Sequence, residues 1–224
     1  MSVWDKYNAR MNVSGTTRRE RALNHTQSYI ERKSVDLLSS NDVLINGVKQ
    51  TVTILNQRED MSLKKICSMP GESLIHGGIV DFANSKWLIT EVDANNEVYS
   101  SGKMQRCNHL LRWINTDGKI IEKWCVVEDG TKYLIGEKTE HIMSIGDARI
   151  AVTIGKDKDT VFLKRGDRFL IDDVDSEQVL AYQITKPNRL FNVYGDGGVY
   201  KFILNEVNVT DNDNVMLRIA DSTC

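Results

Sequence analysis

Short apolar runs separated by glycine-containing turns dominate the sequence from residue 43 onwards. Val43–Ile45 and Val48–Leu55 flank Asn46-Gly47. Asn-Gly between two apolar runs is the strongest short hairpin signal, because both residues tolerate positive φ. Thr116-Asp117-Gly118 separates another pair of runs in the same way. Many short strands at such spacing are typical of a β-barrel or a β-sandwich.

The same pattern predicts further strands and turns along the chain. Pro70-Gly71 closes a strand, and Asn84-Ser85 is the expected tip of a hairpin. The predicted strands cover residues 64–68, 79–82, 86–92, 104–113, 119–127, 148–154, 168–171, 179–184, 190–194 and 199–204, and the last two flank a tip at 195–198. The apolar run at 215–219 is either a terminal strand or a tethering arm.

One amphipathic helix is predicted near the N-terminus, after an aromatic arm. Thr17 and Glu20 have the spacing of a capping box. Apolar residues then recur at i, i+3, i+4 and i+7, which predicts a helix over residues 17–33. Arg18, Arg19 and Arg21 lie in its first turn, where cations oppose the helix dipole. They form either a solvated polar face or a positive patch for an acidic partner.

These elements predict a mainly β protein, with an N-terminal helix followed by one or two small β-barrel or sandwich units. The predicted division is an N-terminal arm and helix over residues 1–36, a β-barrel domain over 37–140 and a C-terminal β domain with a tail over 141–224. A chain of 224 residues can bury roughly 70% of its unfolded surface. It therefore needs no disulfide or metal to fold.

Charge and cysteine content narrow the function classes. The net charge of −2 argues against a protein that coats nucleic acid by neutralising phosphates, but it allows a ring through which DNA slides. The four cysteines form no C-x-x-C pair, so we expect free thiols. The sequence shows no apolar signal core and no apolar run long enough to span a membrane.

No catalytic or metal-binding motif stands out. The histidines lack zinc-ligand spacing, and His76-Gly77-Gly78 without a nucleophile elbow is interpreted as a turn. Carboxylates gather in two places, where they either bind Ca²⁺ or form solvated acidic loops; these are Asp172, Asp173, Asp175 and Glu177, and Asp211 with Asp213. We therefore expect no enzymatic activity and no cofactor. Core packing is the expected role of the tryptophans within strand patterns, Trp87, Trp113 and Trp124.

Several strings, spread over residues 5–200, resemble the head-closure or head–tail connector proteins of tailed bacteriophages. They are Arg18-Arg19-Glu20-Arg21, Met69-Pro70-Gly71-Glu72, Trp87-Leu88-Ile89-Thr90-Glu91-Val92-Asp93, Gly102-Lys103-Met104 with Cys107-Asn108, Arg112-Trp113, Val126-Val127-Glu128-Asp129 and Arg165-Gly166-Asp167-Arg168-Phe169. The resemblance implies a virion protein of the neck, assembled in the host cytoplasm. It would form a ring below the portal, close the DNA-filled head and join it to the tail.

The resemblance also implies the partners: other copies in the ring, a portal or adaptor protein, a tail-tube or tail-completion protein, and DNA passing through the lumen without sequence-specific binding. No membrane is involved. Arginine and aromatic residues are enriched at interface hot spots, so the expected partner interface comprises Trp4, Tyr7, Arg18, Arg19 and Arg21. One alternative is a tail or baseplate β module that binds a carbohydrate or a protein. Another is a small hydrolase, which would need convergent acid–base groups.

Overall fold

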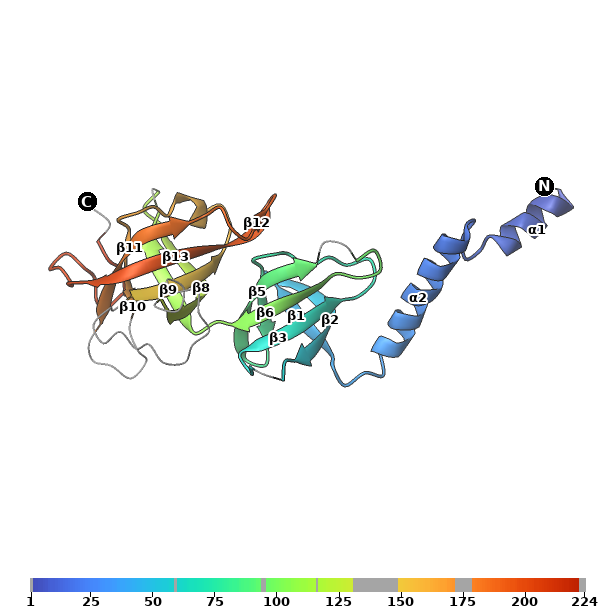
Figure 1. Cartoon of the computed structure of the whole chain (residues 1–224), viewed down its shortest axis with the longest axis horizontal. Coiled ribbons are helices and arrows are strands. Elements are labelled where there is room, and N and C mark those ends of the chain that lie inside the picture. Colours follow the sequence, from blue (N-terminus) through green and yellow to red (C-terminus); the bar gives the residue numbers. More distant parts are fainter. Residues whose placement is uncertain are drawn as a thin grey trace. The chain divides into compact units, whose positions relative to one another are not determined.

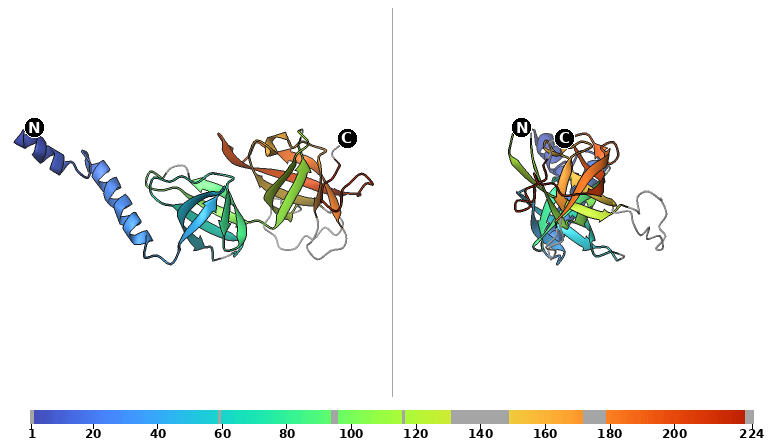
Figure 2. Two further views of the ribbon diagram at one scale, coloured as in Figure 1. Left: turned by 180° about the vertical axis from the view of Figure 1, so that it is seen from behind. Right: turned by 90° about the vertical axis from the view of Figure 1, so that its left-hand side faces the viewer.

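The computed structural model describes residues 2–58, 60–93, 96–115, 117–130, 149–171 and 179–221, and Figures 1 and 2 show it from three sides. It is mainly β, with helices only before the first strand, apart from a single 3₁₀ turn, in the described part of the chain. The predicted fold class is therefore confirmed. The chain divides into two compact units, one of residues 1–74 with 92–103 and the other of residues 75–91 with 104–224.

The N-terminal region contains α1 (Val3–Met11) and α2 (Arg18–Ser34). The helix predicted over residues 17–33 is confirmed as α2, with Thr17 as its N-cap. The preceding residues were expected to form an aromatic arm, and α1 was not predicted. That helix has only nine residues, too few for a repeated apolar period to stand out.

Strands β1 to β6 close into a barrel in the order β1-β2-β3-β6-β5-β4. Alternate residues of β1 and β2 are buried, such as Val43, Ile45, Val52 and Ile54, as the two-residue period of a strand requires. The strands are β1 (Ser40–Ile45), β2 (Val48–Asn56), β3 (Leu63–Ser68), β4 (Ile79–Phe82), β5 (Ser85–Asp93) and β6 (Ser101–Arg106).

Two hairpin turns test the sequence predictions directly. Asn46 and Gly47 have φ of 50° and 83° and join β1 to β2, so the predicted Asn-Gly hairpin is confirmed. In the β4–β5 hairpin the positive φ angles fall on Ala83 and Asn84. Ser85 already pairs with Phe82 in the ladder, so the turn lies one residue before its predicted place.

The second sheet has the order β10-β11-β13-β9-β8-β7, and β12 pairs with β13. Its two end strands approach each other, because the rings of Trp113 in β7 and Phe169 in β10 lie 6.0 Å apart at 83°. The sheet thus curls into a barrel-like form around a buried core. Its strands are β7 (His109–Ile114), β8 (Ile120–Asp129), β9 (Arg149–Gly155), β10 (Arg168–Ile171), β11 (Leu180–Asn188), β12 (Val193–Tyr194) and β13 (Gly197–Val207), with a 3₁₀ turn η1 (Thr160–Phe162) before β10.

The single strand predicted over residues 104–113 is wrong, because the chain breaks at Cys107-Asn108 into β6 and β7. The side chain of Asn108 donates from Nδ2 to the Val127 carbonyl and accepts from the Val127 N–H, both at 2.8 Å. The amide side chain of Asn108 thus makes the two hydrogen bonds to Val127 that a backbone partner would otherwise make in the β-ladder. The sequence prediction placed the hairpin of β7 and β8 in the domain of residues 37–140. In the structure β8 pairs with β9, from Cys125↔Ile154 to Asp129↔Ile150, so this hairpin belongs to the second sheet. The predicted boundary at 140/141 lies outside the described residues.

The last part of the chain departs from the predicted strands. In the predicted hairpin at 190–204, only Val193 and Tyr194 pair with β13, and the tip is Gly195-Asp196. The apolar run at 215–219 is not a strand. It forms a tight turn closed by a bridge between Asn214 and Ile219.

Candidate functional site

The start of α2 is fixed by its own residues. The Thr17 hydroxyl accepts the Glu20 N–H at 3.1 Å, and the Glu20 carboxylate accepts the Thr16 and Thr17 N–H groups at 2.8 and 3.2 Å. A hydrogen bond from the Thr16 hydroxyl, followed by those from the backbone, lowers the pKa of Glu20. The predicted capping box is therefore confirmed, and it holds the three arginines at a defined end of a helix.

The three arginines of α2 have different neighbours. Arg21 donates from Nε to the Gly15 carbonyl at 3.0 Å and so supports the turn before the helix. Arg19 pairs with Glu97 at 2.6 Å, but both side chains are exposed, and such a pair contributes little stability. The Arg18 guanidinium has no hydrogen-bond or ion-pair partner among the described residues. Arg18 is therefore the most available of the three for another molecule.

The aromatic residues of the predicted interface lie on α1. The rings of Trp4 and Tyr7 meet edge to face, with centroids 5.9 Å apart. Trp4 is nevertheless 72% exposed. Among the side chains of residues 2–36 whose burial is described, only Ser34 is buried. All five predicted interface residues are thus on the surface, divided between two helices that bury almost nothing.

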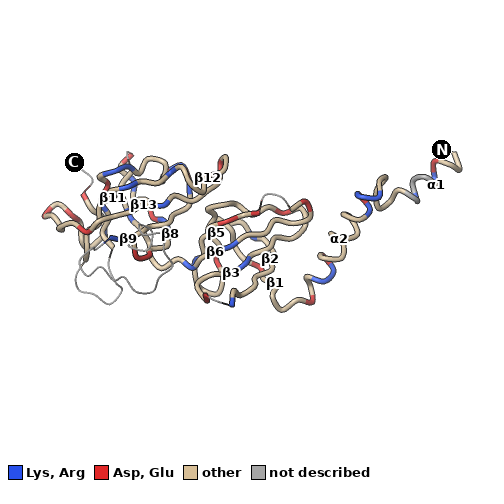
Figure 3. Tube along the Cα trace, viewed as in Figure 1, with Lys and Arg blue, Asp and Glu red and all other residues tan. Residues whose placement is uncertain are grey.

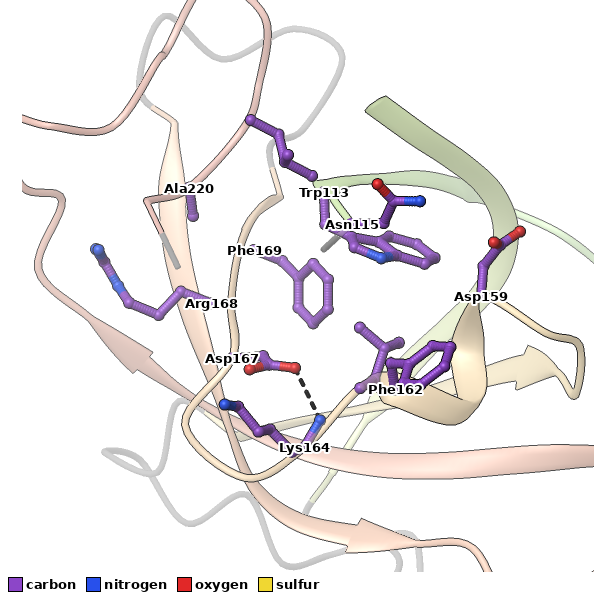
Figure 4. A pocket seen from close by; sticks show the side chains of 11 residues that line it. Trp113, Asn115, Asp159, Phe162, Lys164, Asp167, Arg168, Phe169 and Ala220 are labelled. Carbon is purple, nitrogen blue, oxygen red and sulfur yellow. Dashed lines mark hydrogen bonds between the residues drawn. The ribbon is translucent and has the colours of Figure 1, made fainter. Parts of the chain in front are cut away.

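A cavity of about 380 Å³ lies in the second unit. Figure 4 shows Trp113, Phe162 and Phe169 around it. Trp113 and Phe169 are buried, whereas Phe162 is 71% exposed. The lining comes from the end of β7, the segment around η1, the start of β10 and the tail; it comprises Trp113, Ile114, Asn115, Asp159, Phe162, Leu163, Lys164, Asp167, Arg168, Phe169 and Ala220.

The η1 segment that carries Phe162 is held by local hydrogen bonds. The Asp157 carboxylate accepts the N–H groups of Asp159 and Thr160, both at 2.9 Å. The buried Thr160 hydroxyl accepts the Asp157 N–H at 2.8 Å and donates to the Gly155 carbonyl at 3.1 Å. Asp157 also pairs with Lys123 of β8. These contacts fix the position of Phe162 although its ring faces solvent.

Carboxylates supply part of the cavity wall. Burial raises the pKa of Asp167, and the hydrogen bond from the Lys164 N–H at 2.7 Å offsets this only in part. Asp159 lies 3.3 Å from the Lys123 ammonium. The cavity therefore combines aromatic walls with two acidic and two basic side chains, and burial of the Asp167 carboxylate is only partly offset.

An ion pair anchors the tail beside the cavity. Arg168 contacts both Asp213 oxygens, at 3.1 and 2.8 Å, and the two side chains are 10% and 0% exposed. Burial alone would raise the pKa of Asp213. The N–H groups of Thr210 and Asp221 and the Arg168 guanidinium outweigh it and hold the pKa below its usual value.

The structure assigns a structural role to one carboxylate of the two acidic clusters. Asp211 and Asp213 were expected either to bind Ca²⁺ or to form a solvated loop, but the Asp213 side chain is buried against Arg168. Asp172, Asp173, Asp175 and Glu177 lie outside the described residues. Within the described ranges, no group of three or more His, Cys, Asp or Glu could hold a metal ion. No helix in those ranges is long and apolar enough to cross a membrane. Cys67, Cys107 and Cys125 are free thiols, as predicted.

Comparison with known proteins gives a phage relationship. Residues 10–106 match a family described as the YomX N-terminal domain. Over 206 residues the chain is 23% identical to the SPbeta prophage-derived protein YomX of Bacillus subtilis (strain 168), covering 80% of this chain and 88% of that protein. This chain is related to a prophage protein. These matches support the phage origin that the resemblance implied, and the head-closure role stays a proposal.

A solved structure also aligns with much of the chain. It is the K. pneumonia MrkH–c-di-GMP complex, with 10% sequence identity, 82% of this chain and 85% of that chain covered, and a TM-score of 0.25. A TM-score of 0.25 is too low to establish a shared fold.

Proposed function

We propose that this chain is a structural virion protein of a phage neck. It forms a ring below the portal, closes the DNA-filled head and joins it to the tail. Its partners are other copies of itself, the portal or an adaptor, and a tail-tube or tail-completion protein, while DNA passes through the lumen. It carries out no chemistry and needs no cofactor. The resemblance to head-closure proteins and the relationship to a prophage protein support this proposal.

The observation that carries the proposal is the exposed N-terminal arm, defined as residues 1–36 with α1 and α2. Isolated helices shorter than about 12–15 residues are marginal in water, and α1 has nine residues. Most helical stability in proteins comes from packing an apolar face, yet the arm buries almost nothing within its own chain. Trp4 and Arg18 are exposed, and tryptophan and arginine are among the residue types that contribute most binding energy at protein interfaces. Such an arm fits a subunit whose helices are stabilised by packing against neighbouring subunits.

Electron microscopy of particles made with and without the gene product tests this function. Without it, we expect filled heads that lose DNA and lack tails. Supplying the wild-type chain should restore joined particles, and supplying a Trp4→Ser, Tyr7→Ser variant of normal stability should not. Stable filled heads with tails in the absence of the gene product would refute the neck role.

A tail or baseplate β module that binds a protein partner is the second candidate. The loop between β11 and β12 favours it, because Leu190 is 87% exposed and Phe191 is exposed beside it. The side-chain Oδ1 of Asn188 accepts both of their N–H groups at 3.4 Å, so the loop carries its own side-chain hydrogen bonds. A Leu190→Ser, Phe191→Ser phage would then assemble complete particles that fail to infect. If this variant instead failed to join heads to tails, the result would favour the neck role.

A further inference from the structure

We infer that the arm of one copy docks on the second unit of a neighbouring copy and places Trp4 in the cavity lined by Trp113, Phe162 and Phe169. This inference rests on the proposed ring and names the contact between its subunits. The partner is therefore a second copy of this chain.

The arm presents one large side chain for such a contact. Trp4 meets Tyr7 in an edge-to-face pair, yet it stays 72% exposed. The helix places Trp4 and Tyr7 three residues apart on one side. A rigid aromatic side chain gives large contact area at low cost in conformational entropy. Trp4 thus has the properties of an interface anchor.

The cavity has the properties of an acceptor for one aromatic side chain. Its volume of about 380 Å³ is at the lower end of the range for ligand pockets. The floor includes the edge-to-face pair Trp113 and Phe169, and aromatic rings favour such geometries with a further ring. The exposed ring of Phe162 is held in place by the η1 hydrogen bonds. A docked indole would cover it.

Charge supports a second copy as the source of the arm. Residues 1–36 contain seven Lys or Arg and four Asp or Glu, a net charge of +3, so the remaining residues carry −5 of the total of −2. Figure 3 shows the basic residues along α2. The charged side chains that line the cavity are balanced, Asp159 and Asp167 against Lys164 and Arg168, so the attraction comes from the opposite net charges of the arm and the remaining residues.

An arm and a cavity are two different surfaces, so each copy can donate an arm to one neighbour and receive an arm from the other. Heterologous contacts of this kind generate a closed ring when the rotation between copies closes. The contact therefore suits ring assembly without any self-complementary patch.

Complementation between two full-length variants tests the contact. Trp4→Ala removes the anchor, and Phe162→Arg adds a charge of the arm's own sign to the cavity mouth. Each variant alone should self-associate at least tenfold more weakly than wild type in sedimentation velocity, with an unchanged melting temperature. An equimolar mixture should form a heterodimer and stop there, because only one intact arm and one intact cavity remain to meet.

Matched controls define the specificity. Tyr29→Ala removes another exposed aromatic ring of the arm, and Tyr194→Arg changes a ring of the second unit that is as exposed as Phe162, at 71% each. Both should associate like wild type.

A monomeric wild-type chain, or a mixture of Trp4→Ala and Phe162→Arg that forms no heterodimer, would overturn the inference. The proposed function is tested separately by the particles. If Phe162→Arg assembles normally while Trp4→Ser, Tyr7→Ser blocks tail joining, the neck role stands and the arm binds elsewhere. If heads without the gene product keep their DNA and tails, the neck role itself fails.

Discussion

At the residue scale, two tryptophans of this chain lie in opposite environments. Trp87 in β5 is 4% exposed and its ring lies 6.5 Å from that of Phe82, whereas Trp4 is 72% exposed. Trp87→Ala should lower the free energy of unfolding by roughly 3–5 kcal/mol through lost burial and a cavity. The same change at Trp4 should stay within about 0.5 kcal/mol. Urea denaturation measures both, and a loss below about 1 kcal/mol at Trp87 would contradict its core role.

Two glycines with nearly the same φ allow the cost of a left-handed backbone to be distinguished from the cost of a steric clash. Gly47 and Gly77 have φ of +83° and +84°, but a Cβ at Gly47 meets open space and a Cβ at Gly77 lies 2.0 Å from the Gly198 carbonyl oxygen. Gly47→Ala should cost about 1–2 kcal/mol, the penalty of a left-handed residue. Gly77→Ala should cost more, because backbone of β13 must move as well. Equal losses in the free energy of unfolding would show that the contact at Gly77 relaxes freely.

At the element scale, local signals predicted the structure well. The capping box of α2 and the Asn46-Gly47 turn depend on residues within a few positions of each other, so the sequence contains the whole interaction. The break between β6 and β7 depends on Asn108 meeting Val127, nineteen residues away. A strand pattern carries no information about such a partner, so the sequence indicated one continuous strand.

The candidate site was predictable only in part. The exposed arginines and aromatics of the arm were predicted from residue type and from the unfavourable placement of cations at a helix start. The cavity was not, because its lining comes from segments far apart in the chain. Trp113 was correctly predicted to be buried, but its sequence context does not show that one side of it borders a cavity. Arg168 and Asp213 likewise carry no shared sequence signal.

The ion pair between Arg168 and Asp213, which anchors the C-terminal segment, should make the stability of the chain depend on pH. The pKa of Asp213 is lower in the folded chain than in the unfolded chain, so its contribution is complete above the unfolded pKa of about 4 and is lost as the pH falls through the folded pKa. Asp213→Asn leaves the buried Arg168 without its counter-charge. This should cost about 3–5 kcal/mol at pH 7.

Denaturation at pH 7 and pH 3 measures this contribution. The wild-type chain should lose more free energy of unfolding between the two pH values than Asp213→Asn. Asp42→Asn is the matched control, because Asp42 pairs with Lys49 on the surface and should change stability little. Identical acid profiles for wild type and Asp213→Asn would rule out the ion pair as the acid-sensitive group of the tail.

At the scale of the whole molecule, the charge distribution separates the arm from the rest. The arm carries +3 and the remaining residues −5, so association through the arm should weaken as salt screens the charges. The basic residues of the first turn of α2 work against the helix dipole. Natural proteins accept such local costs mainly where a site needs them. This placement fits the proposed role of the arm in assembly.

Charge reversal on α2 tests this directly. Arg18→Glu with Arg19→Glu should block ring formation and tail joining, because it removes the positive patch, while the changed charges favour the helix start. The melting temperature should hardly change, since both side chains are exposed and the Arg19–Glu97 pair is a surface pair. Arg32→Glu with Lys33→Glu is the control: it gives the same net charge on the same helix but reverses its last turn. If assembly tolerates the first double variant as well as the control, the arginines are a solvated helix face and the interface must be sought at the hairpin tips.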